Sequence, residues 1–133
     1  MTKRNSTFQC QLCGNIVELL HVGGGTLVCC GQNMKELEES TADTSIEKHV
    51  PFIEKTDTGY LVKVGQSQDH PMMDAHYIQW IELHTSDAEY RVFLKPGDKP
   101  EADFPIGHEQ EITGAREFCN LPVSYTHLTL PTN

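Results

Sequence analysis

The chain has 133 residues, of which 38% are hydrophobic and 22% charged, a composition typical of a globular protein with one domain or two small ones. Ten Lys and Arg against 19 Asp and Glu give a formal net charge of −9. This balance disfavours nucleic-acid binding, which needs clustered cations, and docking on an anionic membrane surface. No apolar run approaches the roughly 20 residues of a membrane span, and no signal peptide is indicated, so we expect a cytoplasmic protein.

Four of the five cysteines lie within the first 30 residues, as Cys10-x2-Cys13 and the adjacent pair Cys29-Cys30. In a reducing compartment, cysteines clustered at such short spacings more often bind a metal than form disulfides. Four thiolates suit Zn(II) or a single iron, and the spacing alone favours neither metal. Adjacent cysteines cannot adopt the relaxed turn that Cys-x2-Cys allows. We therefore expect a distorted angle between the two sulfur–metal bonds at Cys29-Cys30.

Residues 1–37 carry too few apolar side chains to fold by hydrophobic burial alone, so we expect the metal to staple this segment. Within it, Gly23-Gly24-Gly25 separates two apolar stretches and predicts a hairpin turn between short strands. Residues 34–44 are polar and acidic, which predicts a linker with a loose turn of helix.

Residues 45–120 show the pattern of strands. Residues 51–55 and 60–64 flank a turn at Asp57-Thr58-Gly59, and residues 76–84 and 90–94 flank a second turn, so each pair predicts a hairpin. Residues 95–100 form a loop, and residues 109–119 can form a last strand. Strands at this spacing, without a helical apolar period, predict an antiparallel β-sandwich and an all-β protein.

The second half also contains candidate metal ligands: His49, His70, His76 and the solitary Cys119. Each alone fits a surface residue or a hydrogen-bonded core residue. His70 and His76, however, flank a loop that starts with a proline, and two such imidazoles can converge on one ion. With Cys119 they form a mixed nitrogen and sulfur site that suits Fe, Cu or Zn.

Glu47 and Lys48 directly precede His49. The simpler interpretation of this pair is a solvated charged turn. The functional interpretation is a carboxylate and a cation beside a metal, where Lys48 attracts a small anion that the net charge of −9 repels.

These residues fall in motifs that resemble the desulfoferrodoxin family, the two-domain form of superoxide reductase. Cys10-Gln11-Leu12-Cys13-Gly14 and Cys29-Cys30-Gly31 resemble its desulforedoxin-type N-terminal domain. The resemblance to its catalytic domain is carried by Glu47-Lys48-His49-Val50-Pro51, His70-Pro71-Met72, His76-Tyr77-Ile78, Phe93-Leu94-Lys95-Pro96-Gly97 and Ala115-Arg116-Glu117-Phe118-Cys119-Asn120. It spans about residues 5–121.

The resemblance implies a four-Cys iron domain over residues 1–37 and an immunoglobulin-like β-sandwich over residues 38–121. It implies iron at Cys10, Cys13, Cys29 and Cys30. It also implies a non-haem Fe(II) site of four equatorial imidazoles and an axial thiolate. His49, His70, His76 and Cys119 occupy matching positions.

The implied activity is one-electron reduction of superoxide to hydrogen peroxide, with the iron re-reduced by rubredoxin or a similar small donor. Glu47 matches a carboxylate that can close the sixth coordination position. Lys48 matches a cation that guides superoxide and helps to protonate the product. A homodimer is also implied.

The chain departs from the family pattern after Cys119-Asn120, where the fourth histidine is absent and Pro122 stands in its place. Residues 122–133 contain no Asp, Glu, Lys or Arg, and this tail resembles foreign read-through rather than a native end. The departure leaves an alternative open: a non-catalytic, iron-binding electron-transfer protein. A zinc-ribbon interaction protein is a third hypothesis, which the acidic charge and the adjacent cysteines disfavour.

Overall fold

The computed structural model describes residues 2–41, 51–65, 70–120 and 123–129, with side chains described outside 39–41 and 123–129. All regular elements in these ranges are β-strands, which confirms the predicted fold class. None of the described residues forms a helix long and apolar enough to cross a membrane. Contacts divide the chain into two units, residues 1–38 and 39–133, and each is described by itself.

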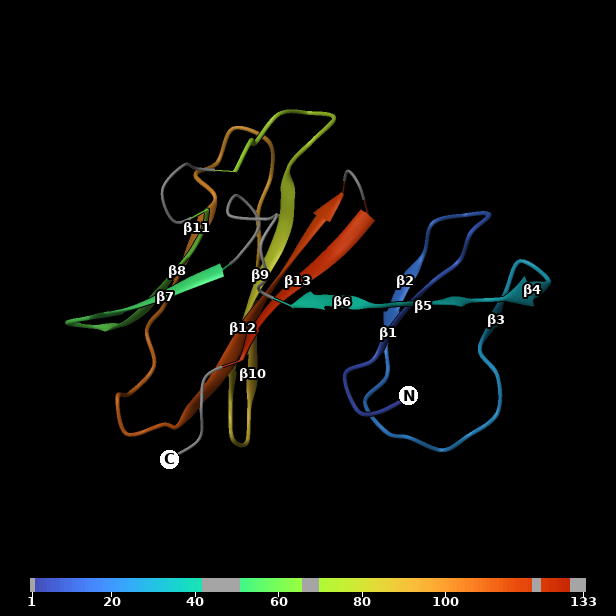
Figure 1. Ribbon diagram of the computed structural model, residues 1–133, viewed down its shortest axis with the longest axis horizontal. Helices are drawn as coiled ribbons and strands as arrows, with labels where there is room; N and C mark the ends of the chain where they lie inside the picture. Colours follow the sequence, from blue (N-terminus) through green and yellow to red (C-terminus); the bar gives the residue numbers. More distant parts are fainter. Residues whose placement is uncertain (1, 42–50, 66–69, 121–122, 130–133) are drawn as a thin grey trace. The chain divides into compact units, whose positions relative to one another are not determined.

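The first unit contains five short strands: β1 (Thr7–Gln9), β2 (Ile16–Glu18), β3 (Val28–Cys29), β4 (Gln32–Asn33) and β5 (Lys35–Leu37). Strands β2, β1 and β5 form an antiparallel sheet in that order, and β3 and β4 form a separate two-stranded sheet (Figure 1). The hairpin predicted at Gly23-Gly24-Gly25 is wrong, because β2 and β3 lie in different sheets. The helical turn predicted within residues 34–44 is also wrong for residues 34–41, because residues 35–37 and 39–41 are strands, and residues 42–44 lie outside the described residues.

The turn between β3 and β4 consists of Cys30 and Gly31, with φ angles of 55° and 78°. Positive φ at both central residues is the backbone of a type I′ hairpin turn, which tightly connects two twisted strands. Glycine adopts this conformation freely, whereas Cys30 adopts it at a steric cost. The adjacency of Cys29 and Cys30 therefore places one cysteine at the end of a strand and the other inside the turn.

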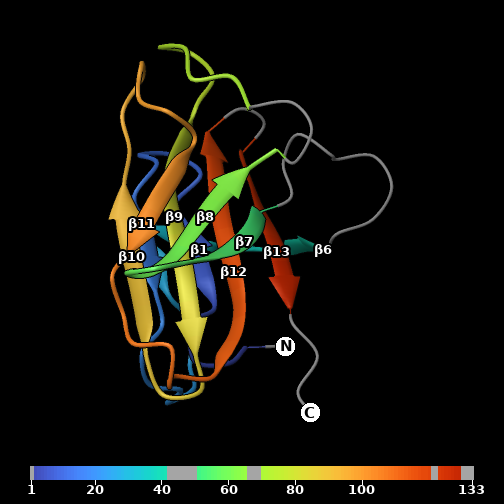
Figure 2. The same cartoon turned by 90° about the vertical axis from the view of Figure 1, so that its left-hand side faces the viewer.

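The second unit is built from two sheets (Figures 1 and 2). The larger sheet has the order β10-β9-β12-β13-β6 and the smaller sheet the order β11-β8-β7. All neighbouring strands run antiparallel except β13 and β6. Their bounds are β6 (Glu39–Thr41), β7 (Pro51–Thr56), β8 (Gly59–Val64), β9 (Ile78–Thr85), β10 (Glu89–Phe93), β11 (Glu101–Phe104), β12 (Ile112–Asn120) and β13 (Val123–Thr129).

Buried apolar side chains from both sheets meet in a single core, which confirms the predicted sandwich. The two predicted hairpins are present as β7–β8 and β9–β10. Strand β11 was missed because prolines flank it and its pattern is short, although Ala102 and Phe104 are its buried positions. The core residues are Val62, Val64, Ile78, Ile81, Leu83, Ala102, Phe104, Ala115 and Cys119.

The uncharged tail continues the larger sheet. Residues 123–129 form β13, which pairs antiparallel with β12 and parallel with β6. Pro122 lies outside the described residues. The foreign origin of this tail stays a prediction.

Candidate metal centres

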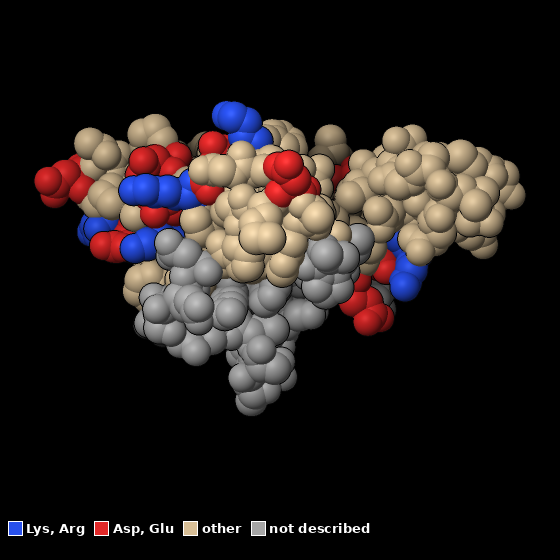
Figure 3. Space-filling view, turned by 90° about the horizontal axis from the view of Figure 1, so that it is seen from above, with Lys and Arg blue, Asp and Glu red and all other residues tan. Residues whose placement is uncertain are grey.

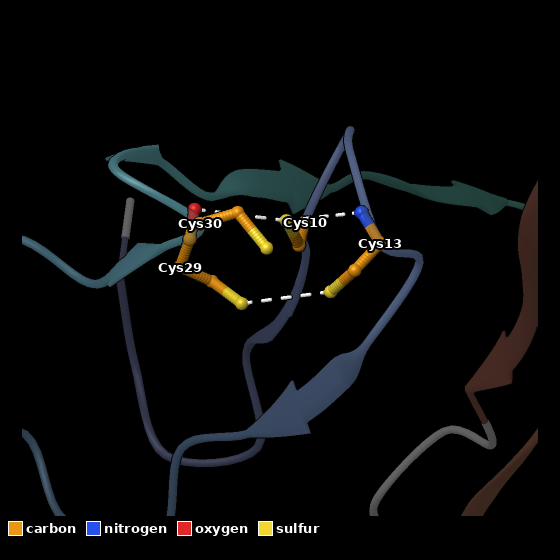
Figure 4. Close-up of side chains that lie close together, drawn as sticks. All are labelled: Cys10, Cys13, Cys29 and Cys30. Atoms are coloured by element: carbon orange, nitrogen blue, oxygen red, sulfur yellow. Dashed lines mark hydrogen bonds between the residues drawn. The ribbon is translucent and has the colours of Figure 1, made fainter.

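The four N-terminal cysteines converge on one point, although the turn after β1 supplies one pair and the β3–β4 hairpin supplies the other. Their sulfur atoms all lie within 4.8 Å of one another. Cys10 and Cys13 come from the turn after β1, and Figure 4 shows their side chains facing those of Cys29 and Cys30. All four are free thiols, so the cluster is not held by disulfides.

The spacing of the sulfur atoms fits a single tetrahedral ion. Sγ of Cys13 lies 3.6 Å from Sγ of Cys29. Two thiolates on a tetrahedral metal with bonds of about 2.3 Å would lie about 3.8 Å apart. The cluster is therefore close to the geometry of a four-thiolate site.

Backbone N–H groups converge on the sulfur of Cys10. The N–H of Cys13 donates to Cys10 Sγ at 3.4 Å, within a turn that the N–H of Gly14 closes on the Cys10 carbonyl at 3.0 Å. Donation by the backbone of Cys13, and then of Leu12, lowers the pKa of Cys10 from 9.0 to about 6. Cys10 is therefore the thiol best prepared to be a thiolate at neutral pH.

The neighbouring sulfur atoms raise the pKa values of the second pair, Cys29 and Cys30. Hydrogen bonding with the thiol of Cys13, and then of Cys10, raises the pKa of Cys30 to about 12. The same neighbours raise the pKa of Cys29. A cation bound among the sulfurs would favour the thiolates that the cluster otherwise disfavours, which is the expected linkage between metal binding and proton release.

A second group forms in the sandwich from His70, His76 and Cys119. Their ligand atoms also lie within 4.8 Å of one another. Cys119 is fully buried in β12, and its Sγ lies 3.4 Å from Nε2 of His70. The rings of His70 and His76 meet edge to face, with centroids 4.9 Å apart.

Both imidazoles have the hydrogen bonding of metal ligands. Nδ1 of His70 donates to the carbonyl of Pro71 at 2.8 Å, which leaves Nε2 with its lone pair on the side of Cys119. Nε2 of His76 is buried and has no hydrogen-bond partner among the described residues. A buried polar atom without a partner is uncommon and needs an explanation, and a metal ion supplies one.

The distances also fit a metal with nitrogen and sulfur ligands. An imidazole nitrogen and a thiolate at right angles on one metal would be about 3.1 Å apart, for bonds of about 2.1 Å and 2.3 Å. The 3.4 Å between His70 Nε2 and Cys119 Sγ is close to this value. The structure thus brings together three of the four predicted ligands.

The other predicted site residues, Glu47, Lys48 and His49, lie outside the described residues. Asn120, by contrast, was not predicted to act at the site. Its side chain accepts a hydrogen bond from the backbone of Tyr77, next to His76. Its position directly after Cys119 was the signal available in the sequence.

The comparisons with known proteins agree with this geometry. Residues 2–37 match the family model "Desulfoferrodoxin, N-terminal domain", and residues 41–122 match the model "Desulfoferrodoxin". The second match ends at residue 122, where the uncharged tail begins. The chain belongs to the desulfoferrodoxin family.

Individual relatives cover nearly the whole chain. The desulfoferrodoxin of Syntrophotalea carbinolica is 55% identical over 124 residues, which cover 91% of this chain and 94% of the relative. The desulfoferrodoxin of Nitratidesulfovibrio vulgaris is 54% identical over 121 residues, with the same coverage. The crystal structure of the superoxide reductase from Treponema pallidum matches with a TM-score of 0.70 and 30% identity, covering 92% of this chain and 96% of that one.

Proposed function

We propose that the protein is a superoxide reductase that converts superoxide to hydrogen peroxide at an iron held by His49, His70, His76 and Cys119. The observation that carries the proposal is the convergence of His70, His76 and Cys119 in a buried site. It is supported by a similar solved structure that is a superoxide reductase. The reaction consumes one electron and two protons for each superoxide and yields one hydrogen peroxide.

Iron fits the donor set of the sandwich site, because imidazole and thiolate together suit Fe, Cu or Zn and the reaction requires a one-electron donor. When bound there, Fe(II) would supply the single electron. Cys119 would contribute a thiolate ligand that donates electron density to the bound metal, as cysteine ligands do in haem enzymes. Its complete burial in β12 keeps this sulfur away from water and oxidants.

Glu47 and Lys48 are proposed to act on the substrate side of the site. Superoxide is a small anion, and the net charge of −9 disfavours its approach. On the face shown in Figure 3, the Lys and Arg of the described residues lie among Asp and Glu and form no continuous basic patch. A single lysine next to a ligand histidine would therefore provide local attraction, and its ammonium group could share a proton with the product. Glu47 would provide the carboxylate that closes the site when no substrate is present.

We further propose a second iron at Cys10, Cys13, Cys29 and Cys30, so that each chain binds two irons. A rubredoxin-type donor would return one electron to the protein for each superoxide reduced. The proposed homodimer is supported by exposed apolar side chains in the first unit. Several apolar side chains of this unit also line a hollow of about 370 Å³. The residues that line it are Asn15, Val17, Glu18, Leu19, Leu27, Val28, Cys29 and Met34.

One alternative has a specific observation in its favour: a non-catalytic, iron-binding electron-transfer protein. Pro122 stands where the family pattern has the fourth histidine, so the sandwich site lacks one imidazole. Fewer protein ligands would weaken iron binding at this site without changing the four-Cys site.

Superoxide consumption separates the two functions. The iron-loaded chain should consume superoxide and form one hydrogen peroxide per superoxide, whereas Cys119→Ser should not exceed spontaneous dismutation, which gives half that yield. Cys13→Ser serves as the matched control, because it removes a sulfur from the other site. An iron-loaded chain no faster than Cys119→Ser would favour the electron-transfer protein.

A further inference from the structure

Asn120 connects the end of β12 to the segment that carries His76. Its side-chain Oδ1 accepts a hydrogen bond from the N–H of Tyr77 at 2.8 Å. Its own N–H donates to the carbonyl of Tyr77 at 3.2 Å, and its side-chain amide lies 3.5 Å from the carbonyl of Ala75. The residue after one proposed ligand, Cys119, thus contacts the residues on both sides of another, His76.

This contact lies where the sheet itself becomes irregular. Strands β9 and β12 pair Phe118 with Trp80, but the next pair is Cys119 with Ile78, so Gln79 is an extra residue. Such bulges change the direction of side chains and often lie next to active sites. Strand β9 begins at Ile78, so His76 and Tyr77 lie before it.

The backbone hydrogen bonds of His76 itself are made within its own turn. Its N–H donates to the carbonyl of Met73 and its carbonyl accepts from the N–H of Met73, both at 2.9 Å. These bonds close the turn from Met73 to His76 on itself. The hydrogen bonds that Ala75 and Tyr77 form with Asn120 connect this turn to β12 and therefore to Cys119.

We propose that Asn120 is a positioning residue that sets where His76 lies relative to the sulfur of Cys119. This inference rests on the proposed function, in which both side chains hold one metal. An asparagine side chain offers an acceptor and a donor at once, which suits a position between the N–H of Tyr77 and the carbonyl of Ala75. Because the 2.8 Å bond is the short one, the acceptor is the important group.

The test compares Asn120→Leu, which removes both groups, with Asn120→Asp, which keeps the acceptor. Gln110→Leu is the matched control, because Oε1 of Gln110 accepts a hydrogen bond from the Tyr90 hydroxyl at 3.1 Å elsewhere in the sandwich. The full chain is first loaded with one Zn(II) at the four-Cys site. Amide hydrogen exchange of Tyr77 is then measured without further metal, and Co(II) is titrated into the second site.

In Asn120→Leu, we expect the Tyr77 amide to exchange about tenfold faster, because one hydrogen bond is lost. Co(II) affinity should fall about tenfold or more, as for other changes to residues that orient metal ligands. The thiolate-to-cobalt absorption band should also shift, since the angle between the histidine and the thiolate changes. In Asn120→Asp, the Tyr77 exchange rate, the Co(II) affinity and the absorption band should all stay close to their wild-type values. Gln110→Leu should change none of these three quantities.

Wild-type Co(II) affinity and an unshifted band in Asn120→Leu would overturn the positioning role, even if Tyr77 exchanged faster. Loss of Co(II) binding in Asn120→Asp as well would also overturn it, because the acceptor is still present. If Asn120→Leu does not fold, Asn120→Ala replaces it in the same comparison. A wild-type chain that binds no Co(II) at His70, His76 and Cys119 would instead refute the proposed function.

Discussion

The Sγ atom of Cys119 lies 3.4 Å from Nε2 of His70, although the two residues are 49 positions apart in the chain. Cys119 belongs to β12 in the larger sheet. The backbone N–H of His70 donates to the carbonyl of Val64, the last residue of β8 in the smaller sheet, at 3.3 Å. The proposed iron site therefore joins the two sheets of the sandwich, and its geometry depends on how they pack.

Lys48 is predicted to guide superoxide to the site. Lys48→Ile should slow superoxide capture by the iron-loaded chain and weaken the dependence of the rate on ionic strength, because one attracting charge is lost. Stopped-flow or pulse-radiolysis rates at several salt concentrations measure both effects. Lys35→Ile, which removes one positive charge from β5, is the control for net charge. Equal rates for the two variants at low salt would contradict the role of Lys48.

Pro122 is predicted to limit iron binding at the second site. Pro122→His should restore the fourth imidazole and raise iron affinity there by about tenfold or more, the scale on which ligand environments change metal binding. Competition with a chelator measures this affinity, and the four-Cys site in the same sample is the internal reference. An affinity that rises at both sites, or at neither, would show that position 122 does not contribute a ligand.

Glu82 is the centre of a buried charged group on the larger sheet. Its carboxylate has no solvent exposure and accepts hydrogen bonds from Trp80 Nε1 at 2.7 Å and from Arg116 Nε at 2.9 Å. His84 and Arg91 also contact it, at 2.8 and 3.1 Å. Arg116 is itself 1% exposed, so the two charges depend on each other.

Glu82→Gln should lower the free energy of unfolding by roughly 3 kcal/mol, because it removes the buried negative charge that lies 2.8 Å from the guanidinium of Arg116. Urea unfolding of the Zn(II)-loaded chain measures the change. The control is Lys95→Ala, which removes an exposed lysine whose ammonium lies 3.7 Å from Asp98. Such exposed pairs contribute little, so the control should change stability by less than about 1 kcal/mol. A similar small effect in both variants would contradict the account of Glu82.

Cys10 should give the metal-free first unit a distinctive pH dependence. Its pKa is lowered to about 6 by backbone N–H groups, whereas the unfolded thiol titrates near 9.0. The thiolate therefore adds stability that is fully present above pH 9 and is lost as the pH falls through about 6. Below about pH 6, metal binding must also displace the proton of Cys10, so affinity should fall more steeply.

The ultraviolet absorbance of thiolates in the metal-free chain measures this titration. One thiol should ionise with a midpoint near pH 6, and Cys10→Ser should remove that step. Cys119→Ser, which alters a buried cysteine of the other unit, should leave the step in place. A step that survives in Cys10→Ser would assign the low pKa to another cysteine.

The sequence predicted the features that depend on neighbouring residues. Alternating apolar residues around Gly59 and around residues 85–88 marked two hairpins that the structure confirms. The glycines at 23–25 were misleading because the strands on either side of them pair elsewhere: β2 pairs with β1 and β3 pairs with β4. Strand β1 also pairs with β5, nearly 30 residues away. No local pattern could show this.

The alternation of polar and apolar residues along the strands also could not predict which side chains are buried on the outer face of the larger sheet. Trp80, Glu82 and His84 alternate with apolar residues as a solvated face would, yet Glu82 is fully buried beneath Arg91 and Arg116. For the candidate site, the sequence motifs suggested which side chains could converge, and in the structure the ligand atoms of His70, His76 and Cys119 lie within 4.8 Å of one another. Their role as metal ligands stays a prediction. The bulge at Gln79 and the contact of Asn120 with Tyr77 depend on strand register, which the sequence does not display.

The most direct test of the account is the iron content of chains purified without oxygen. We predict two irons per chain in the wild type and one in each of Cys13→Ser and Cys119→Ser, because each variant loses a ligand of one site. The remaining iron should give the spectrum of a four-thiolate centre in Cys119→Ser and of a histidine and thiolate centre in Cys13→Ser. One iron per wild-type chain, unchanged by Cys119→Ser, would contradict an iron site in the sandwich and with it the proposed reaction.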